Sequence, residues 1–158
     1  MPPNTRSRVL CVDDDEDACE LLSVLMKAYD IDATCVRSAA EVWPLIKAES
    51  FDLYMLDGWL PKLDGFELCR QIRASDSRTP ILFYSGAAYD ADRQKGIAAG
   101  ANAYVTKPDV DDLIETMTGL LANAAAENIP PRWVSSAASL PAENWLSSQF
   151  FSAEPASD

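Results

Sequence analysis

The chain has 158 residues, 48% of them hydrophobic, and a formal net charge of −12. This length suits one domain with a sizeable core plus a tail, and the composition is that of an ordinary globular protein. The negative charge makes nucleic acid and anionic membranes poor direct partners, and it favours a metal cation or a basic protein surface.

The N-terminal region lacks the features of a signal peptide. Charged residues at Arg6, Arg8, Asp13 and Asp14 leave no room for the apolar segment that such a peptide requires. No apolar run in the sequence approaches the roughly 20 residues that a membrane helix needs. We therefore expect a cytoplasmic protein without membrane insertion.

The sequence contains four cysteines and no histidine. The cysteines form no CxxC pair and have no zinc-type spacing. Cys11 and Cys35 fall within strand-like runs, where a reduced thiol behaves as a small hydrophobic group. We expect all four, including Cys19 and Cys69, to be structural thiols. The absence of histidine excludes Ser-His and Cys-His catalytic pairs, and it excludes this chain as a phosphohistidine donor.

Short apolar runs alternate with helical segments along the chain. The runs predict strands over residues 9–12, 33–36, 51–56, 80–84 and 103–105. Apolar residues at helical spacing predict helices over residues 18–26, 39–47, 66–72, 91–99 and 110–121, and Asp64 with Glu67 resembles a capping pair before the third of them.

This alternation of five strands with five helices predicts an α/β fold, with a parallel sheet covered on both faces. Right-handed crossovers would then produce a doubly wound arrangement. In such folds ligands bind beyond the carboxyl ends of the strands, where the strand order reverses. We therefore expect the functional site at that edge of the sheet.

Polar side chains follow four of the predicted strands: Asp13 and Asp14 the first, Asp57 the third, Ser85 the fourth and Lys107 the fifth. Three converging carboxylates repel one another unless a cation lies among them, and a site made only of oxygen ligands suits Mg²⁺. A lysine and a hydroxyl opposite this ion suit a phosphoryl group. Since an aspartate carboxylate can act as a phosphoryl nucleophile, the central Asp57 is the predicted acceptor.

Four segments, VLCVDDD, YMLDGWLPKLDG, ILFYSGAA and GANAYVTKP, resemble the receiver domain of bacterial two-component response regulators. The resemblance covers residues 7–125, with all segments in order and at the family's spacing. It implies a flavodoxin-like five-stranded sheet of strand order 2-1-3-4-5. Residues 1–6 are then expected to be a leader, and residues 126–158 a disordered or docked tail without an output domain.

The resemblance assigns roles to individual residues. Asp57 matches the phosphoacceptor, Asp14 the direct ligand of Mg²⁺, and Asp13 the acid that usually holds the metal through water. The backbone carbonyl of Trp59 matches a further metal ligand. Lys107 matches the lysine that contacts a phosphoryl oxygen, and its peptide bond to Pro108 is expected to be cis.

Other positions correspond to the family's switch and to the path of hydrolytic water. Ser85 matches the switch hydroxyl, which also contacts the phosphoryl group, and Tyr104 matches the switch aromatic, although it could be a plain core residue. The side chains of Trp59 and Ala87 are expected to border the approach of water. Trp59 could instead point outward as a docking residue.

The function implied is that of a phosphoacceptor signalling protein. It would take a phosphoryl group from a histidine kinase or a phosphotransfer protein, with Mg²⁺ bound, and signal to a downstream protein through altered contacts. A second copy of the chain is a further candidate partner. The protein is not expected to be an enzyme in its own right, but to assist its own phosphorylation and dephosphorylation.

Two alternatives belong to other functional classes. A haloacid-dehalogenase-like phosphatase carries the motif DxDG after a strand, and the first aspartate of this motif is its nucleophile. Methionine stands at that position here (Met55), which argues strongly against such a phosphatase. A scaffold that resembles a receiver but works without phosphorylation is the second alternative. Such domains usually lose an acid or the lysine, whereas this chain keeps the complete set.

Overall fold

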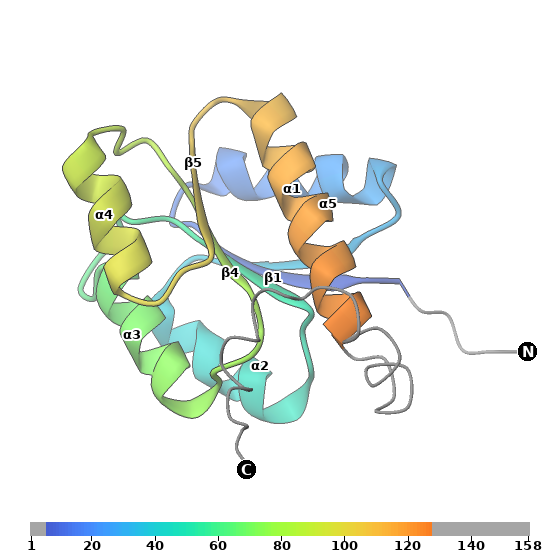
Figure 1. Cartoon of the computed structure of the whole chain (residues 1–158), viewed down its shortest axis with the longest axis horizontal. Helices are drawn as coiled ribbons and strands as arrows, with labels where there is room; N and C mark the ends of the chain where they lie inside the picture. The colour runs from blue at the N-terminus through green and yellow to red at the C-terminus, as the bar shows by residue number, and fades with distance from the viewer. Residues whose placement is uncertain (1–5, 128–158) are drawn as a thin grey trace, which may run out of the picture. The chain divides into compact units, whose positions relative to one another are not determined.

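Five parallel strands form one sheet in the order β2-β1-β3-β4-β5, which confirms the predicted strand order (Figure 1). The computed structural model describes residues 6–127. The expected leader, except for Arg6, and the expected tail beyond residue 127 lie outside the described residues. The strands are β1 Arg8–Val12, β2 Asp32–Val36, β3 Leu53–Leu56, β4 Ile81–Ser85 and β5 Ala103–Thr106.

Helices cover both faces of this sheet, as the alternation of strands and helices predicted. Helices α1 and α5 lie on one face, and α2, α3 and α4 lie on the other (Figure 1). The helices are α1 Glu16–Ala28, α2 Val42–Ala48, α3 Gly65–Ser75, α4 Asp90–Ala98 and α5 Val110–Glu127, with a short 3-10 helix η1 at Ala39–Glu41.

Successive residues of each strand contribute to different cores, because side chains alternate across a sheet. Leu10 and Val12 of β1 belong to the core on one face, whereas Val9 and Cys11 belong to the core on the other. Strand β3 is buried along its whole length, from Leu53 to Leu56. This complete burial fixes the position of the residues that follow it.

The predicted helix over residues 39–47 differs from the observed structure in one respect. Its first turn is the 3-10 helix η1, and α2 begins only at Val42. Pro44 lies in the first turn of α2, where the missing N–H has no intrahelical partner to lose. The predicted cap of α3 is confirmed, since the Asp64 side chain accepts a hydrogen bond of 2.8 Å from the N–H of Glu67.

The expectation of four free thiols is wrong for two of them. Cys19 in α1 and Cys35 in β2 form a disulfide, with their Cα atoms 5.8 Å apart, whereas Cys11 and Cys69 are free and buried. The pair is 16 residues apart in the sequence, and only the packing of α1 beside β2 brings it together. Within residues 6–127, no helix is both long enough and apolar enough to cross a membrane.

Candidate functional site

Asp57 lies directly after the buried strand β3, and its side chain has three hydrogen-bond donors around it. The Asp57 N–H donates to the carbonyl of Val12 at 3.0 Å, which fixes its backbone beside the end of β1. Oδ1 accepts hydrogen bonds from the Ser85 hydroxyl at 2.9 Å and from the Trp59 N–H at 3.1 Å. Oδ2 accepts from the Lys107 ammonium at 3.3 Å. The structure therefore brings the predicted acceptor together with the predicted hydroxyl and lysine.

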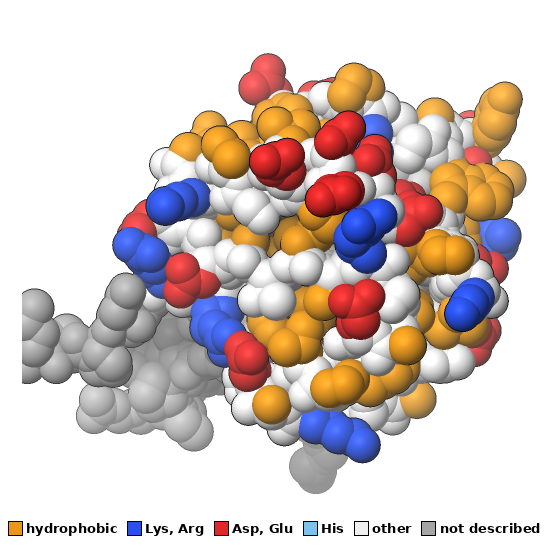
Figure 2. Space-filling model, turned by 180° about the vertical axis from the view of Figure 1, so that it is seen from behind, with side chains coloured by type: hydrophobic (Ala, Val, Ile, Leu, Met, Phe, Trp, Pro, Cys, Tyr) orange, Lys and Arg blue, Asp and Glu red, His pale blue; other side chains and the backbone are white. Residues whose placement is uncertain are grey.

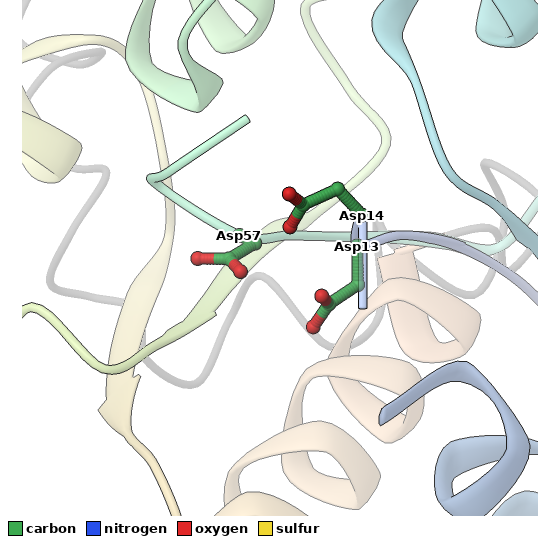
Figure 3. Close-up of side chains that lie close together, drawn as sticks. All are labelled: Asp13, Asp14 and Asp57. Atoms are coloured by element: carbon green, nitrogen blue, oxygen red, sulfur yellow. The ribbon is translucent and has the colours of Figure 1, made fainter. Parts of the chain in front are cut away.

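Asp13 and Asp14 follow β1 at the same edge of the sheet. Asp13 is only 2% exposed, whereas Asp14 is exposed. Each of Asp13, Asp14 and Asp57 offers a carboxylate oxygen, and these atoms all lie within 4.8 Å of one another (Figure 3). Oxygen ligands at this spacing, with one acid facing solvent, fit a hard divalent cation such as Mg²⁺.

Lys107 supplies the positive charge that faces these acids. Its N–H donates to the Ser85 carbonyl at 2.9 Å, and its ammonium lies 2.5 Å from Oδ2 of Asp13. Burial by itself would lower the pKa of Lys107, but the hydrogen bond to Asp13 and the charges of Asp57 and Asp13 outweigh it and raise the pKa above its ordinary value. Lys107 is therefore an ammonium ion at neutral pH. Its peptide bond to Pro108 is cis, as expected.

Tyr104 lies inward, with 8% of its surface exposed. Its hydroxyl donates a hydrogen bond of 2.7 Å to the carbonyl of Ala87, and its ring stacks on Phe83 with the centroids 5.6 Å apart. The N–H of Ala87 in turn donates to the Ser85 hydroxyl at 3.3 Å. Ser85, Ala87 and Tyr104 thus form one connected group next to Asp57.

The loop that follows Asp57 presents Trp59 to solvent. Trp59 is 62% exposed. This exposure favours a ring that points outward over a ring that covers Asp57. The loop closes where the N–H of Gly65 donates to the carbonyl of Gly58 at 3.1 Å. A Cβ atom at Gly65 would collide with the carbonyl oxygen of Asp57, so only glycine lets α3 begin this close to the acceptor.

Two residues around Tyr104 were not found by sequence reasoning. Gly96 of α4 faces the Tyr104 ring, and a Cβ atom there would lie 2.9 Å from Cδ2 of that ring. The Arg93 guanidinium lies over the same ring, 5.6 Å from its centroid, and donates to the Tyr104 carbonyl at 3.2 Å. A glycine inside a helical pattern was the available signal, because such glycines often have a packing role.

A family model described as the response regulator receiver domain matches residues 9–118. The chain belongs to this family. Curated relatives include the cell cycle response regulator CtrA of Brucella ovis and of Brucella abortus, each 34% identical over 108 residues. The match covers 68% of this chain and 47% of the relative, so the receiver chain spans about half the length of these relatives.

Solved receiver structures share the fold. A CheY-like receiver protein from Methanospirillum hungatei has a TM-score of 0.73 at 26% identity, covering 78% of this chain and 100% of its own. The response regulator TrrA of Thermotoga maritima, solved with Mg²⁺ and a beryllium fluoride, has a TM-score of 0.66 at 26% identity, covering 72% and 98%. The protein is therefore a two-component receiver with the flavodoxin-like arrangement.

Proposed function

We propose that this receiver accepts a phosphoryl group on Asp57 and signals through a change in its protein contacts. The observation that supports this most directly is the environment of the Asp57 carboxylate. Asp57 is only 7% exposed, and its carboxylate accepts hydrogen bonds from Ser85, Trp59 and Lys107. The carboxylates of Asp13 and Asp14 lie close enough to share a metal ion with it. A purely structural acid would not require a lysine and two further carboxylates beside it.

In the proposed reaction a carboxylate oxygen of Asp57 attacks phosphorus. The new bond joins this oxygen to phosphorus, while the bond from phosphorus to the donor's imidazole nitrogen breaks and its electron pair stays with the imidazole. Lys107 and the Ser85 hydroxyl, which here contact the two carboxylate oxygens of Asp57, would then each contact a phosphoryl oxygen. These contacts stabilise the charge spread over the equatorial oxygens.

Asp13, Asp14 and Asp57, with the backbone carbonyl of Trp59, are the groups proposed to hold Mg²⁺. When bound, the ion would neutralise part of the charge on the incoming phosphoryl group. The chain's own contribution is to hold three carboxylates together at the ends of β1 and β3, with Lys107 compensating part of their repulsion.

We further propose that the signal leaves the site through Ser85 and Tyr104. A phosphoryl group on Asp57 would compete for the Ser85 hydroxyl, which the N–H of Ala87 also contacts. The Tyr104 hydroxyl bonds to the same Ala87 residue, so a shift of Ser85 alters the support of the ring. The surface formed by α4, β5 and α5 is the expected place of changed contacts.

The proposed donor is a histidine kinase or a phosphotransfer protein, since this chain has no histidine of its own. The proposed receiver of the signal is another protein or a second copy of this chain. In Figure 2 acidic side chains gather on the upper part of the face shown, and lysines and arginines are scattered over the same face. The net charge of −12 disfavours direct binding of nucleic acid by this chain. We propose a cytoplasmic location, and a switch that assists its own phosphorylation and dephosphorylation rather than a separate enzyme.

Incubation with acetyl phosphate and Mg²⁺, followed by intact-protein mass spectrometry, tests the acceptor. Native protein should gain one phosphoryl mass, and removal of Mg²⁺ by a chelator should suppress the gain. Asp57→Asn should abolish it, whereas Asp52→Asn, which changes an acid before β3, should not. Equal labelling of the Asp57→Asn variant would show that the acceptor is wrong.

A phosphorylation-independent scaffold is the second candidate, because Tyr104 already lies inward and Ser85 already contacts Asp57. The two candidates differ in what controls partner binding. If the protein is a scaffold, the native chain and the Asp57→Asn variant should retain the same partners, with or without acetyl phosphate. A phosphorylation-driven switch would change its partners only in the native protein.

A further inference from the structure

The disulfide between Cys19 and Cys35 connects α1 to the edge of the sheet. Cys19 lies in the first turns of α1, and Cys35 is the second-last residue of β2. Strand β2 is the first strand of the sheet order, so within residues 6–127 one of its sides has no neighbouring strand. The bond therefore joins the start of a helix to an edge strand, and Cys35 packs against the margin of one core.

The same two segments meet at the acid pair. The N–H of Asp13 donates to the carbonyl of Val36 at 3.0 Å, and the Arg37 side chain donates to the carbonyl of Asp14 at 3.3 Å. The Cys19 sulfur lies 3.3 Å from the carbonyl oxygen of Asp13. The link is thus one of several contacts that hold the loop of Asp13 and Asp14 against the end of β2.

The four cysteines differ in their access to solvent. Cys19 and Cys35 are both half-buried, whereas Cys11 and Cys69 are 0% exposed. A small dissolved oxidant or reductant can therefore reach the linked pair but not the other two. Exposure and a second thiol within bonding distance are the features of cysteines that oxidise reversibly.

We propose that Cys19 and Cys35 are a reversible redox pair, oxidised by a peroxide and reduced by a dithiol, whose state sets the affinity of the acid pair for Mg²⁺. This inference rests on the proposed function, because it assigns the cation to Asp13 and Asp14. In a reducing compartment a disulfide of this kind is a transient state, not a permanent structural element. The pair would then report oxidising conditions to the phosphorylation site.

The oxidation balances with one peroxide for each pair. One cysteine sulfur attacks a peroxide oxygen, the O–O bond breaks, and a sulfenic acid and one water form from hydrogen peroxide. The second thiol attacks the sulfenic sulfur, the S–S bond forms, and a second water leaves. Two electrons pass from the two sulfurs to the peroxide, and a dithiol returns them by thiol–disulfide exchange.

Oxidation should tighten Mg²⁺ binding. In the reduced form the Cys19 thiol can donate to the Asp13 carbonyl, a weak contact that restrains the start of α1 less than a covalent link does. The covalent link restricts the start of α1 further. The Asp13–Asp14 loop therefore loses less conformational entropy when the ion binds. Replacing a residue that supports a metal ligand typically weakens metal binding about 10- to 100-fold. A single tether is a smaller change, so we expect the affinity for Mg²⁺ to differ about threefold between the oxidised and reduced forms.

The chemistry is tested on the full chain by peptide mapping without reduction. After treatment with equimolar hydrogen peroxide, the peptides of Cys19 and Cys35 should be linked within one chain. A dithiol should release them, and Cys11 and Cys69 should react with a thiol-labelling reagent only after unfolding. Oxidation at Cys11 or Cys69, or links between copies in place of the Cys19–Cys35 link, would overturn the assignment.

The consequence is tested by calorimetric titration of Mg²⁺ into the oxidised and the reduced chain. Native protein should bind about threefold more tightly when oxidised. Cys35→Ser, kept reduced, should bind with the affinity of the reduced native chain, since it lacks the link but keeps the Cys19 contact with Asp13. Cys69→Ala, which changes a thiol on the other face of the sheet, should respond like native protein. Equal affinities in the two states of native protein would contradict the proposal, while phosphorylation of Asp57 would still be tested by acetyl phosphate.

Discussion

The Ser85 hydroxyl donates a hydrogen bond of 2.9 Å to Oδ1 of Asp57, and both residues are buried. The same hydroxyl accepts a hydrogen bond from the N–H of Ala87, whose carbonyl accepts one from the Tyr104 hydroxyl. Three successive contacts therefore lead from the proposed acceptor to a buried ring. A change of charge at Asp57 has a short physical route to the surface of α4 and β5.

Ser85→Ala should interrupt this route. We expect a loss of about 1–3 kcal/mol in unfolding free energy, because the hydrogen bonds of the Ser85 hydroxyl with Asp57 and with the Ala87 N–H both disappear. Trp59 still donates to Asp57. Beryllofluoride should change the amide chemical shifts of α4, β5 and α5 in native protein and change them much less in Ser85→Ala. Ser75→Ala, at the end of α3, is the control. Equal shift changes in Ser85→Ala and native protein would show that the signal takes another route.

Gly96→Ala should disturb the inward position of Tyr104. The added Cβ would lie 2.9 Å from Cδ2 of Tyr104 and 3.1 Å from Cδ2 of Phe83, and both of these rings are buried. Overpacking of this kind costs about 1–3 kcal/mol. Chemical denaturation measures the loss, and the NMR signals of the Tyr104 ring should report its displacement.

Gly119 in α5 provides a matched control, because a Cβ atom there meets nothing within 4 Å. Gly119→Ala should leave the protein as stable or raise its stability by about 0.5–1 kcal/mol, since alanine is the better helix former. If Gly96→Ala were equally harmless, the packing of α4 against Tyr104 would be looser than the contacts indicate.

The position of the site at the carboxyl ends of the strands was predictable from sequence for a physical reason, whereas the strand order came from the resemblance to receiver domains. Apolar runs followed at once by Asp13, Asp57 and Lys107 place these residues at one edge of a parallel sheet, whatever the details of packing. The boundaries were less certain, and β3 begins at Leu53 although Phe51 is also buried. Burial there comes from packing onto the core, not from pairing in the sheet.

Two contacts between distant segments were not predictable, the disulfide and the packing of α4 on Tyr104. Cys19 and Cys35 looked like separate structural thiols, because sequence spacing does not reveal that α1 packs beside β2. The contact of Gly96 with Tyr104 depends on the position of α4 over β5, which no local pattern encodes. The inward position of Tyr104 is a rotamer choice, and it depends on the Ala87 carbonyl as a hydrogen-bond acceptor.

Mg²⁺ should stabilise the native chain, and Asp14→Asn should remove most of this effect. An ion that binds only the folded state at 100 times its dissociation constant adds about 2.7 kcal/mol. Asp14 is exposed, so its replacement should leave the fold intact. Thermal unfolding with increasing Mg²⁺ measures the effect, and Asp15→Asn, in the same loop but outside the acidic cluster, is the control. A Tm of Asp14→Asn that rises with Mg²⁺ as in native protein would contradict the ligand assignment.

Stability should fall in alkali partly through Tyr54. Burial, together with the nearby Asp76 carboxylate, raises the pKa of Tyr54 from 10.0 to about 12. The unfolded chain therefore loses this proton first, and unfolding becomes more favourable as the pH rises from 10 towards 12. The slope from this one group is about 1.4 kcal/mol per pH unit.

Tyr54→Phe isolates this contribution, since it keeps the ring but removes the hydroxyl that contacts Asp76 at 3.3 Å. The difference in unfolding free energy between native protein and this variant should diminish as the pH rises above 10. Tyr89→Phe, at a residue that is 79% exposed, is the comparison. A difference that stays constant through alkaline pH would rule out the raised pKa of Tyr54 as a cause.

Trp59 and Ala87 are the residues expected to border the water that hydrolyses the phosphoryl group, and neither side chain can orient water through an amide or carboxylate. We therefore predict a long-lived phosphorylated form. Trp59→Asn should shorten its half-life about tenfold, because the amide can position water for attack. Since Trp59 is 62% exposed, shielding by its ring should matter little, and the phosphorylated Trp59→Leu variant should decay at a rate close to native.

The decay of the phosphorylated protein is measured by mass spectrometry as loss of the phosphoryl mass, with no phosphatase present. Equally fast decay in the leucine and asparagine variants would mean that the ring excludes water, and unchanged decay in both would leave Trp59 as a contact surface.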